Sequence, residues 1–371
     1  MVSIVIFIII LAVLILAHEF GHFITAKKTG VAIEEFGLGF PPRLFGKKGK
    51  DGVFYSINLI PLGGFVKLKG ESGEYRDDPD SFVNRPIRVR ALIIAAGVIM
   101  NVIVAYLLFS VGFMFGLPTI VGDDQLNDPG IKNIKVQIAS VVASSPAQLA
   151  GIQIGDQILS INGQTQATET AYHDFIGQHS QDELTLKILR QEQISEVKVR
   201  PQEIEGFAAG KVLGVTLIQT GIVRHNFFTS WYYGLLATGN VIILVVLAFF
   251  NLFKDLLTGL GLSPDLSGPV GVAVMTGQVV SLGWVYVLQF MALLSLNLAV
   301  INFFPFPALD GGRFLFLIIE KIRRQAVSQK IENIIHSVGF TLLILLILAV
   351  TYRDIVRFGG GFIERVKNIF T

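Results

Sequence analysis

The chain has 371 residues, of which 52% are hydrophobic and only 16% are charged. Because a globular domain usually carries about 25% charged residues, this composition excludes an ordinary soluble protein, a disordered chain, collagen and a coiled coil. The formal net charge of +2 gives no indication of nucleic-acid binding. The absence of cysteine excludes disulfide scaffolds, thiol nucleophiles and cysteine-ligated metal sites. The composition therefore predicts a membrane protein.

The chain begins with an apolar segment. Residues 4–17 are all apolar, and the first basic residue is Lys27. A cleaved signal peptide is the alternative, but such peptides begin with a positively charged region, which residues 1–17 lack. We therefore expect a first transmembrane helix over residues 2–26.

Further uncharged stretches occur along the rest of the chain. A spanning helix needs about 20 mostly apolar residues. On this basis we expect transmembrane helices at 91–117, 283–310 and 336–353. The stretch 226–253 is also uncharged and apolar, and its crossing is ambiguous from composition alone.

Basic residues that flank the spans predict the orientation. Residues 27–90 hold 12 Lys and Arg, and residues 311–335 hold five, whereas the longer segment 118–225 holds eight. We therefore expect 27–90 and 311–335 to be cytoplasmic loops, and 118–225 to be extracytoplasmic. The acidic pair Glu34-Glu35 in the first loop is typical of solvated loop charge.

The extracytoplasmic segment contains a β-rich module at about 132–205. Ser145-Pro146 suits the start of a short helix, and Asn162-Gly163 is a strong turn signal. The run SPAQLAGIQIGDQILSING, residues 145–163, resembles the core of a PDZ domain. The resemblance implies that the module binds extended peptide ends at a sheet edge.

The sequence HEFGH at residues 18–22 continues directly from the first apolar segment. A spacing of four places His18 and His22 on one helical face, where they can share a metal ion, and Glu19 can accept a proton from a metal-bound water. Interfacial histidines that bind nothing are the alternative. However, ionisable groups within a membrane are costly and usually mark function, so we favour a metal site.

A third ligand is needed, because catalytic zinc usually has three protein ligands and one open position. Asp310 ends a 44-residue uncharged run, residues 266–309. Pro305 and Pro307 break the preceding helix, and such irregular backbone at membrane depth is tolerated where it is buried or lines a polar cavity. Gly311-Gly312 allows a sharp turn afterwards. An ordinary helix-end aspartate is the alternative. Four other histidines fit no ligand pattern, and we expect ordinary packing or surface roles for them: His173, His179, His225 and His336.

Together, HEFGH and N-x-x-P-F-P-x-L-D-G-G at residues 302–312 resemble the site-2 protease family of intramembrane zinc metalloproteases, nearest to its RseP-like bacterial branch. The chain has a single PDZ domain where that branch often has two. The resemblance implies a Zn²⁺ cofactor that is bound by His18, His22 and Asp310, and it implies that Glu19 is the catalytic base. It also implies that Asn302, and with it Asn297, binds the substrate backbone or the oxyanion.

Three shorter stretches also resemble that branch, namely 39–43, 59–68 and 267–271. One stretch departs from it, because residues 97–101 lack the proline that often follows the glycine of the second span.

Two β-prone segments, residues 53–58 and 65–69, predict a membrane-associated β-hairpin in the first cytoplasmic loop. We expect Gly63-Gly64 to form its turn. Gly63, Gly64 and Phe65 would then bind substrate, because the hairpin can add the unwound substrate segment as another strand. An ordinary cytoplasmic hairpin is the alternative.

The metal site constrains the topology. Because Asp310 must reach the same ion as His22, the first and third spans must both run from outside to inside. Residues 226–253 then cannot be an odd additional crossing. We expect 226–265 to be a membrane-associated or re-entrant helix.

The predicted fold is a multi-spanning α-helical membrane protein with about four transmembrane helices and one β-rich PDZ domain between spans two and three. The predicted function is intramembrane cleavage of single-span transmembrane proteins, such as anti-sigma factors or signal-peptide remnants, in a bacterial inner membrane. The expected partners are these substrates, peptide ends at the PDZ domain and the lipid bilayer, without nucleic acid. A non-catalytic PDZ-bearing adaptor with a vestigial metal site is the alternative. A transporter is disfavoured because the sequence shows no internal repeat with a corresponding pair of broken helices.

Overall fold

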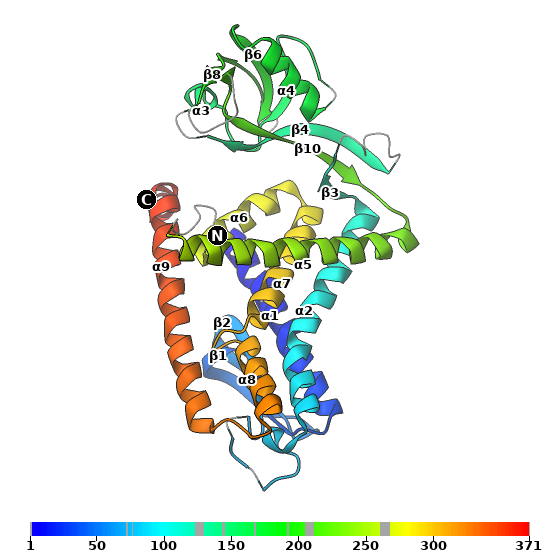
Figure 1. Cartoon of the computed structure of the whole chain (residues 1–371), viewed down its shortest axis with the longest axis vertical. Helices are drawn as coiled ribbons and strands as arrows, with labels where there is room; N and C mark the ends of the chain where they lie inside the picture. Colours follow the sequence, from blue (N-terminus) through cyan, green and yellow to red (C-terminus); the bar gives the residue numbers. More distant parts are fainter. Residues whose placement is uncertain are drawn as a thin grey trace. The chain divides into compact units, whose positions relative to one another are not determined.

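The computed structural model describes residues 2–71, 73–75, 77–122, 130–142, 145–166, 168–190, 193–204, 211–259 and 268–370. The chain divides into two compact units. One comprises Met1–Gly112 and Trp231–Thr371, and the other comprises Phe113–Ser230. The first unit is mainly helical with one small sheet, and the second is rich in β-strands (Figure 1).

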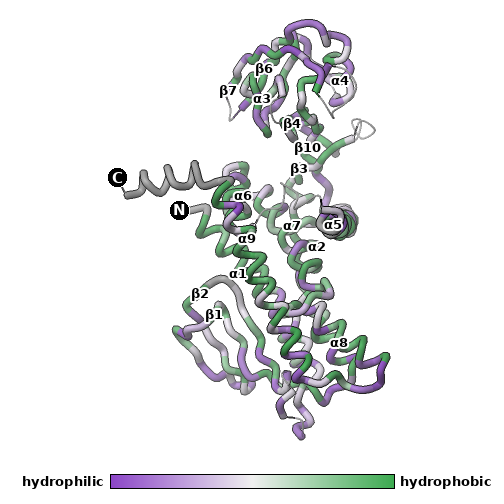
Figure 2. The backbone as a smooth tube through the Cα atoms, turned by 60° about the vertical axis from the view of Figure 1, so that its left-hand side comes forward, coloured by the Kyte–Doolittle hydropathy of each residue, from purple (hydrophilic) through white to green (hydrophobic). Residues whose placement is uncertain are grey.

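Long apolar helices dominate the first unit. Figure 2 shows hydrophobic residues along most of α1 and α2. The helices are α1 (Val2–Lys28), α2 (Ile87–Phe115), α5 (Phe227–Leu257), α6 (Pro269–Leu282), α7 (Trp284–Phe303), α8 (Asp310–Arg323) and α9 (Gln329–Phe370). Among the described residues, five of these helices are long and apolar enough to cross a membrane: α1, α2, α5, α7 and α9. The chain is therefore a multi-helical membrane protein, with the β-rich unit inserted in sequence between α2 and α5.

Two predicted segments near the C-terminus differ from the structure in secondary structure, while their side of the membrane stays a prediction. The expected loop at 311–335 is largely the helix α8, an amphipathic segment that ends in FLFLIIEKIR. The last helix, α9, has 42 residues and begins at Gln329 rather than 336. The segment was expected to be a loop because of its basic residues. Such residues indicate the side of the membrane, but they do not indicate the secondary structure.

The ambiguous segment 226–253 forms most of α5, a single helix of 31 residues. A continuous helix does not turn back, so the re-entrant form of the prediction is wrong. The helix runs across α1, α2 and α7 rather than beside them, since it lies horizontally in Figure 1 and is seen end-on in Figure 2. Its buried Gly234 packs against Ser110 of α2. The membrane-associated position of α5 stays a prediction. Residues 260–265, which belong to the same predicted segment, lie outside the described residues.

The small sheet of the first unit consists of β1 (Ile33–Lys48) and β2 (Phe54–Leu68), which bend so that each contributes two segments. Residues 33–38 pair with 54–57 on one side and with 64–68 on the other. The predicted hairpin turn at Gly63-Gly64 is therefore wrong, because the two predicted strands do not pair with each other.

The central segment 33–38 was missed because its acidic pair reads as loop charge. Both carboxylates have a basic partner, Arg43 farther along β1 and Lys67 on the neighbouring segment of β2. Arg43 Nη2 donates to Glu35 at 2.9 Å, and Lys67 Nζ lies 2.7 Å from Glu34. Opposite charges across neighbouring strands stabilise a sheet, so this pair is compatible with a strand.

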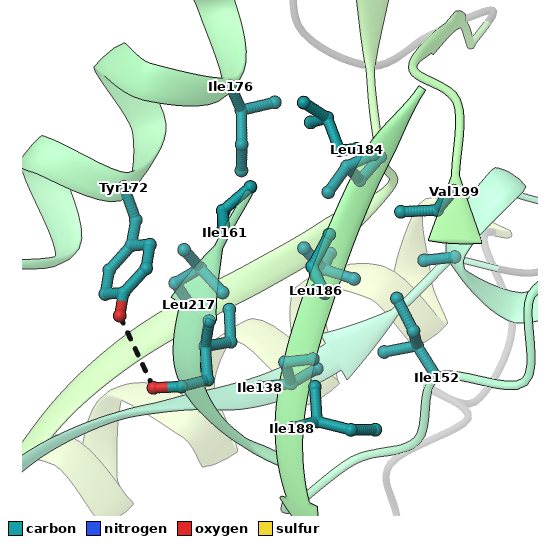
Figure 3. Close-up of a cluster of buried hydrophobic side chains, with 14 of the residues drawn as sticks. Ile138, Ile152, Ile161, Tyr172, Ile176, Leu184, Leu186, Ile188, Val199 and Leu217 are labelled. Atoms are coloured by element: carbon teal, nitrogen blue, oxygen red, sulfur yellow. Dashed lines mark hydrogen bonds between the residues drawn. The ribbon is translucent and has the colours of Figure 1, made fainter. Parts of the chain in front are cut away.

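The second unit is an antiparallel sheet with the strand order β3-β10-β4-β5-β6-β7 and two short helices. Its elements are β3 (Leu117–Ile120), β4 (Ile131–Val141), α3 (Pro146–Leu149), β5 (Gln157–Ile161), α4 (Glu169–Gln178), β6 (Leu184–Arg190), β7 (Gln193–Val199) and β10 (Val215–Val223), with β8 (Gln202–Glu203) paired to β9 (Lys211–Val212). Helix α4 contributes Tyr172 and Ile176 to the core (Figure 3). The buried Tyr172 hydroxyl donates to the Ile158 carbonyl at 3.4 Å.

The local predictions for this unit are confirmed, but its boundary is wrong. Ser145 Oγ accepts a hydrogen bond from Gln148 N at the start of α3. Asn162 and Gly163 both have positive φ, as a tight turn requires. The predicted module 132–205 omits β10, which pairs with strands on both sides, and its buried face carries the polar Gln219 among apolar residues.

Candidate metal centre

Three side chains that are far apart in sequence meet in the first unit. His18 and His22 lie one turn apart on α1, and Asp310 is the first residue of α8. The Asp310 Oδ2 atom lies 3.0 Å from His18 Nε2 and 3.2 Å from His22 Nε2. The two Nε2 atoms are 3.2 Å apart. No other group of three or more potential metal-binding His, Asp or Glu side chains occurs in the described part of the chain.

The donor atoms fit a zinc ion. With Zn–ligand distances of about 2.0–2.1 Å, a tetrahedral site places its ligand atoms about 3.3 Å apart. The three observed separations are close to that value, and one corner of the tetrahedron is left for water or substrate. Two imidazoles and one carboxylate are a usual donor set for catalytic zinc.

A backbone hydrogen bond orients one of the imidazoles. His22 Nδ1 lies 2.8 Å from the Ile93 carbonyl oxygen of α2. Since a carbonyl only accepts, Nδ1 carries the proton and the lone pair of Nε2 is free toward Asp310. Sequence reasoning missed this contact because a backbone acceptor leaves no signature in the residue type.

Two glycines allow the close approach of α1 and α2 at this level. A Cβ atom on Gly97 would overlap His22 Nε2 and would lie 2.8 Å from His18 Cε1. A Cβ atom on Gly21 would lie 2.7 Å from the Ala96 carbonyl carbon. Small residues at a helix crossing let backbones come together in membranes. Gly97 was noted only for lacking a following proline, although its glycine identity was itself the available signal.

Glu19 lies between the metal donors and the edge of the small sheet. Its Oε2 atom accepts a hydrogen bond from the Val66 amide at 3.0 Å. A Cβ atom on Gly64 would be 3.5 Å from Glu19 Cγ. The edge segment 64–68 of β2 therefore runs directly past the carboxylate. The structure therefore places Gly64 beside Glu19, and the substrate-binding role of Gly63, Gly64 and Phe65 stays a prediction.

The chain between α7 and α8 presents Asp310. Helix α7 ends at Phe303 because Phe304 precedes Pro305, and a residue before proline disfavours helical φ/ψ. The predicted sharp turn at Gly311-Gly312 is wrong, since both residues are in the first turn of α8. They are needed for space instead. A Cβ atom on Gly311 would lie 2.5 Å from the Phe303 carbonyl carbon, and one on Gly312 would lie 2.9 Å from that of Phe306.

The two predicted substrate-binding asparagines lie on α7. Asn297 Nδ2 donates to the Leu293 carbonyl of its own helix at 2.9 Å. Asn302 is partly buried in the last turn. Their contact with substrate stays a prediction.

Salt bridges tie α8 to the rest of the site. Arg90 of α2 pairs with Glu320 through two contacts of 2.5 and 3.1 Å. Arg313, one turn after Asp310, pairs with Glu71 just beyond β2. These residues border a cavity of about 230 Å³. The carboxylate donor is thereby connected to both α2 and the sheet.

Comparison with known proteins adds independent information. The model of peptidase family M50 matches residues 6–346. The chain is similar to the zinc metalloprotease RasP of Geobacillus kaustophilus, with 28% identity over 445 residues, covering 96% of this chain and 98% of that protein. It is also similar to the regulator of sigma-E protease RseP of Salmonella typhimurium, with 29% identity covering 95% and 98% of the two chains. A solved PDZ domain of an SdrC-like protein from Listeria innocua is similar to part of the chain. The match covers 25% of this chain and 98% of that domain, with 21% identity and a TM-score of 0.20.

Proposed function

The chain belongs to peptidase family M50, and from that premise we propose that it is an intramembrane zinc metalloendopeptidase that cleaves transmembrane segments of single-span proteins. The observation that carries the proposal is the convergence of His18, His22 and Asp310 within a membrane protein. Ionisable groups within a membrane are costly and usually mark function. Zinc is the cofactor that this donor set favours.

His18, His22 and Asp310 would hold the ion, and Glu19 would do the proton transfer. When bound, zinc supplies Lewis acidity that polarises a carbonyl and activates a water. Glu19 accepts a proton from the attacking water and later delivers it to the leaving amine. The Val66 amide holds the Glu19 carboxylate in place at 3.0 Å. The amides of Asn302 and Asn297 can stabilise an oxyanion without adding net charge.

Substrate would bind along the edge of β2. Among the described residues, 64–68 pair with 33–38 on one side only, and their other edge faces Glu19. A helical peptide bond is already hydrogen-bonded within its helix, so cleavage needs local unwinding. An unwound segment added as a strand at Gly63, Gly64 and Phe65 would satisfy its backbone groups and lie next to the carboxylate.

The β-rich unit would act as a PDZ domain that binds peptide ends. Strand β3 pairs only with residues 220–223 of β10. On that side of β10, residues 215–218 have no strand partner among the described residues. An extended peptide can add to such an edge. We place this unit on the extracytoplasmic side of a bacterial inner membrane, where it would screen substrates before cleavage.

The proposal is tested with purified protein in liposomes and a model single-span substrate. The variant Glu19→Gln keeps the shape of the side chain and loses the base. We expect it to retain stoichiometric zinc by elemental analysis while cleavage falls by at least roughly a hundredfold. Cleavage at the wild-type rate would overturn the proposed role of Glu19. A wild-type protein that binds zinc but cuts nothing would indicate a non-catalytic adaptor.

A further inference from the structure

Residues 304–309 connect α7 to α8, and they lie directly before Asp310. Ala308, two residues before Asp310, has a φ of +79°. Non-glycine residues rarely adopt this left-handed region, and they keep it only where surrounding contacts impose it. The contacts that hold this segment are therefore important for the position of the carboxylate.

One of these contacts comes from α9. The Ala308 amide donates a hydrogen bond to His336 Nδ1 at 2.9 Å. Because Nδ1 accepts, the proton of this neutral imidazole must be on Nε2. The Phe316 ring of α8 packs beside the imidazole, with a centroid distance of 5.5 Å. His336 is thus fixed between the segment and the helix that follows it.

A second contact lies one turn farther along α9. A Cβ atom on Gly339 would be 2.6 Å from the Pro307 carbonyl oxygen and 2.8 Å from its carbon. The backbone of α9 therefore packs directly on Pro307. Residues three apart lie on the same helical face, so His336 and Gly339 together form one surface against residues 307–308.

We infer that His336 is a positioning residue, which holds Ala308 in its left-handed conformation and thereby keeps the Asp310 carboxylate at the two imidazoles. The inference rests on the proposed metalloprotease function. It explains why a histidine on α9 is directed at a backbone amide rather than at a ligand position. Gly339 is the complementary feature, because any side chain there would displace Pro307.

The test compares three substitutions by zinc affinity, measured by chelator competition. In His336→Asn, the side-chain oxygen occupies the place of Nδ1 and can still accept from Ala308. In His336→Gln, the acceptor moves to the place of Nε2, and in His336→Leu it is lost. Loss of a group that orients a metal ligand typically weakens metal binding roughly 10- to 100-fold. We expect that loss for His336→Gln and His336→Leu, and near-wild-type affinity for His336→Asn.

The control is Val338→Ala, an exposed position on the same helix, which should leave zinc affinity unchanged. Equal affinity for His336→Asn and His336→Gln would overturn the inference, even if His336→Leu fails to fold. Because the readout is zinc binding, it is independent of cleavage. A failure of Glu19→Gln to abolish cleavage would contradict the proposed function without affecting this result.

Discussion

At the crossing of α1 and α2, the missing side chain of Gly97 is as important as the imidazoles beside it. His22 occupies the space that a Cβ atom on residue 97 would need, and its ring is held there by the Ile93 carbonyl. The His18 ring lies edge-on to that of His22, with centroids 4.8 Å apart. Helix packing and metal geometry therefore depend on the same few atoms, so a small change in α2 acts directly on the donor set.

The substitution Gly97→Ala adds one methyl group at this point. We expect roughly tenfold or greater loss of zinc affinity, because His22 Nε2 must move away from Asp310. Chelator competition on the purified protein measures the effect. The substitution Ile99→Ala, at an exposed position of α2, is the control. Unchanged zinc affinity in Gly97→Ala would show that the helices can separate without disturbing the site.

Among the elements, α9 contacts both the segment that precedes α8 and the first turn of α6. Near its start it contacts residues 307–308, and farther along it meets the beginning of α6. There, the buried Asp354 carboxylate accepts a hydrogen bond from the Gly271 amide at 2.7 Å. A carboxylate at a helix N-terminus satisfies a free amide and interacts favourably with the helix dipole. Helix α6 in turn packs on α1, which carries the histidines.

Removing this carboxylate should destabilise the first unit. We expect Asp354→Ala to lower the free energy of unfolding by about 1–3 kcal/mol, because a buried amide loses its acceptor. Thermal unfolding in detergent measures the change. The neighbouring Tyr352→Ala, at a position 71% exposed, should have a smaller effect. If both variants unfold at the same temperature, the contact does not contribute to stability.

For the whole molecule, the metal centre determines which way the helices run. Donors at the C-terminal end of α1 and just beyond the C-terminal end of α7 meet at one ion, so α1 and α7 run in the same direction. Helix α2 passes the metal centre and is followed in the chain by the β-rich unit. The number of crossings between α2 and α7 must then be even, and this condition favours a surface position for α5.

The chain contains no cysteine, so single cysteines can report topology. We expect Glu196→Cys to react with a membrane-impermeant maleimide in intact cells, and Lys48→Cys to react only after the inner membrane is permeabilised. For α5, Phe228→Cys and Lys254→Cys should both react from outside. Labelling of Lys254→Cys only from inside would mean that α5 crosses the membrane. Labelling of Glu196→Cys only from inside would contradict the orientation of the whole molecule.

Local patterns were sufficient for much of this protein. The apolar runs predicted the long helices, and the spacing of His18 and His22 predicted a shared helical face. The capping and turn signals predicted the start of α3 and the turn after β5. In each case the physical cause is short-range, because periodicity, capping and hydropathy act within a few residues of the chain. The choice of Asp310 also came from the sequence, but from its resemblance to a family rather than from any local rule.

Only the tertiary structure decided which groups meet across the chain. It placed residues 33–38 between two segments of β2, where Lys67 on the neighbouring segment and Arg43 farther along β1 offset an acidic pair that by itself indicates a loop. It also placed the Val66 amide on Glu19 and His336 on Ala308. These contacts join residues 28 to 47 positions apart and depend on backbone atoms, which are the same in every residue type. Residue identity therefore predicted the reactive groups, whereas packing determined what holds them in place.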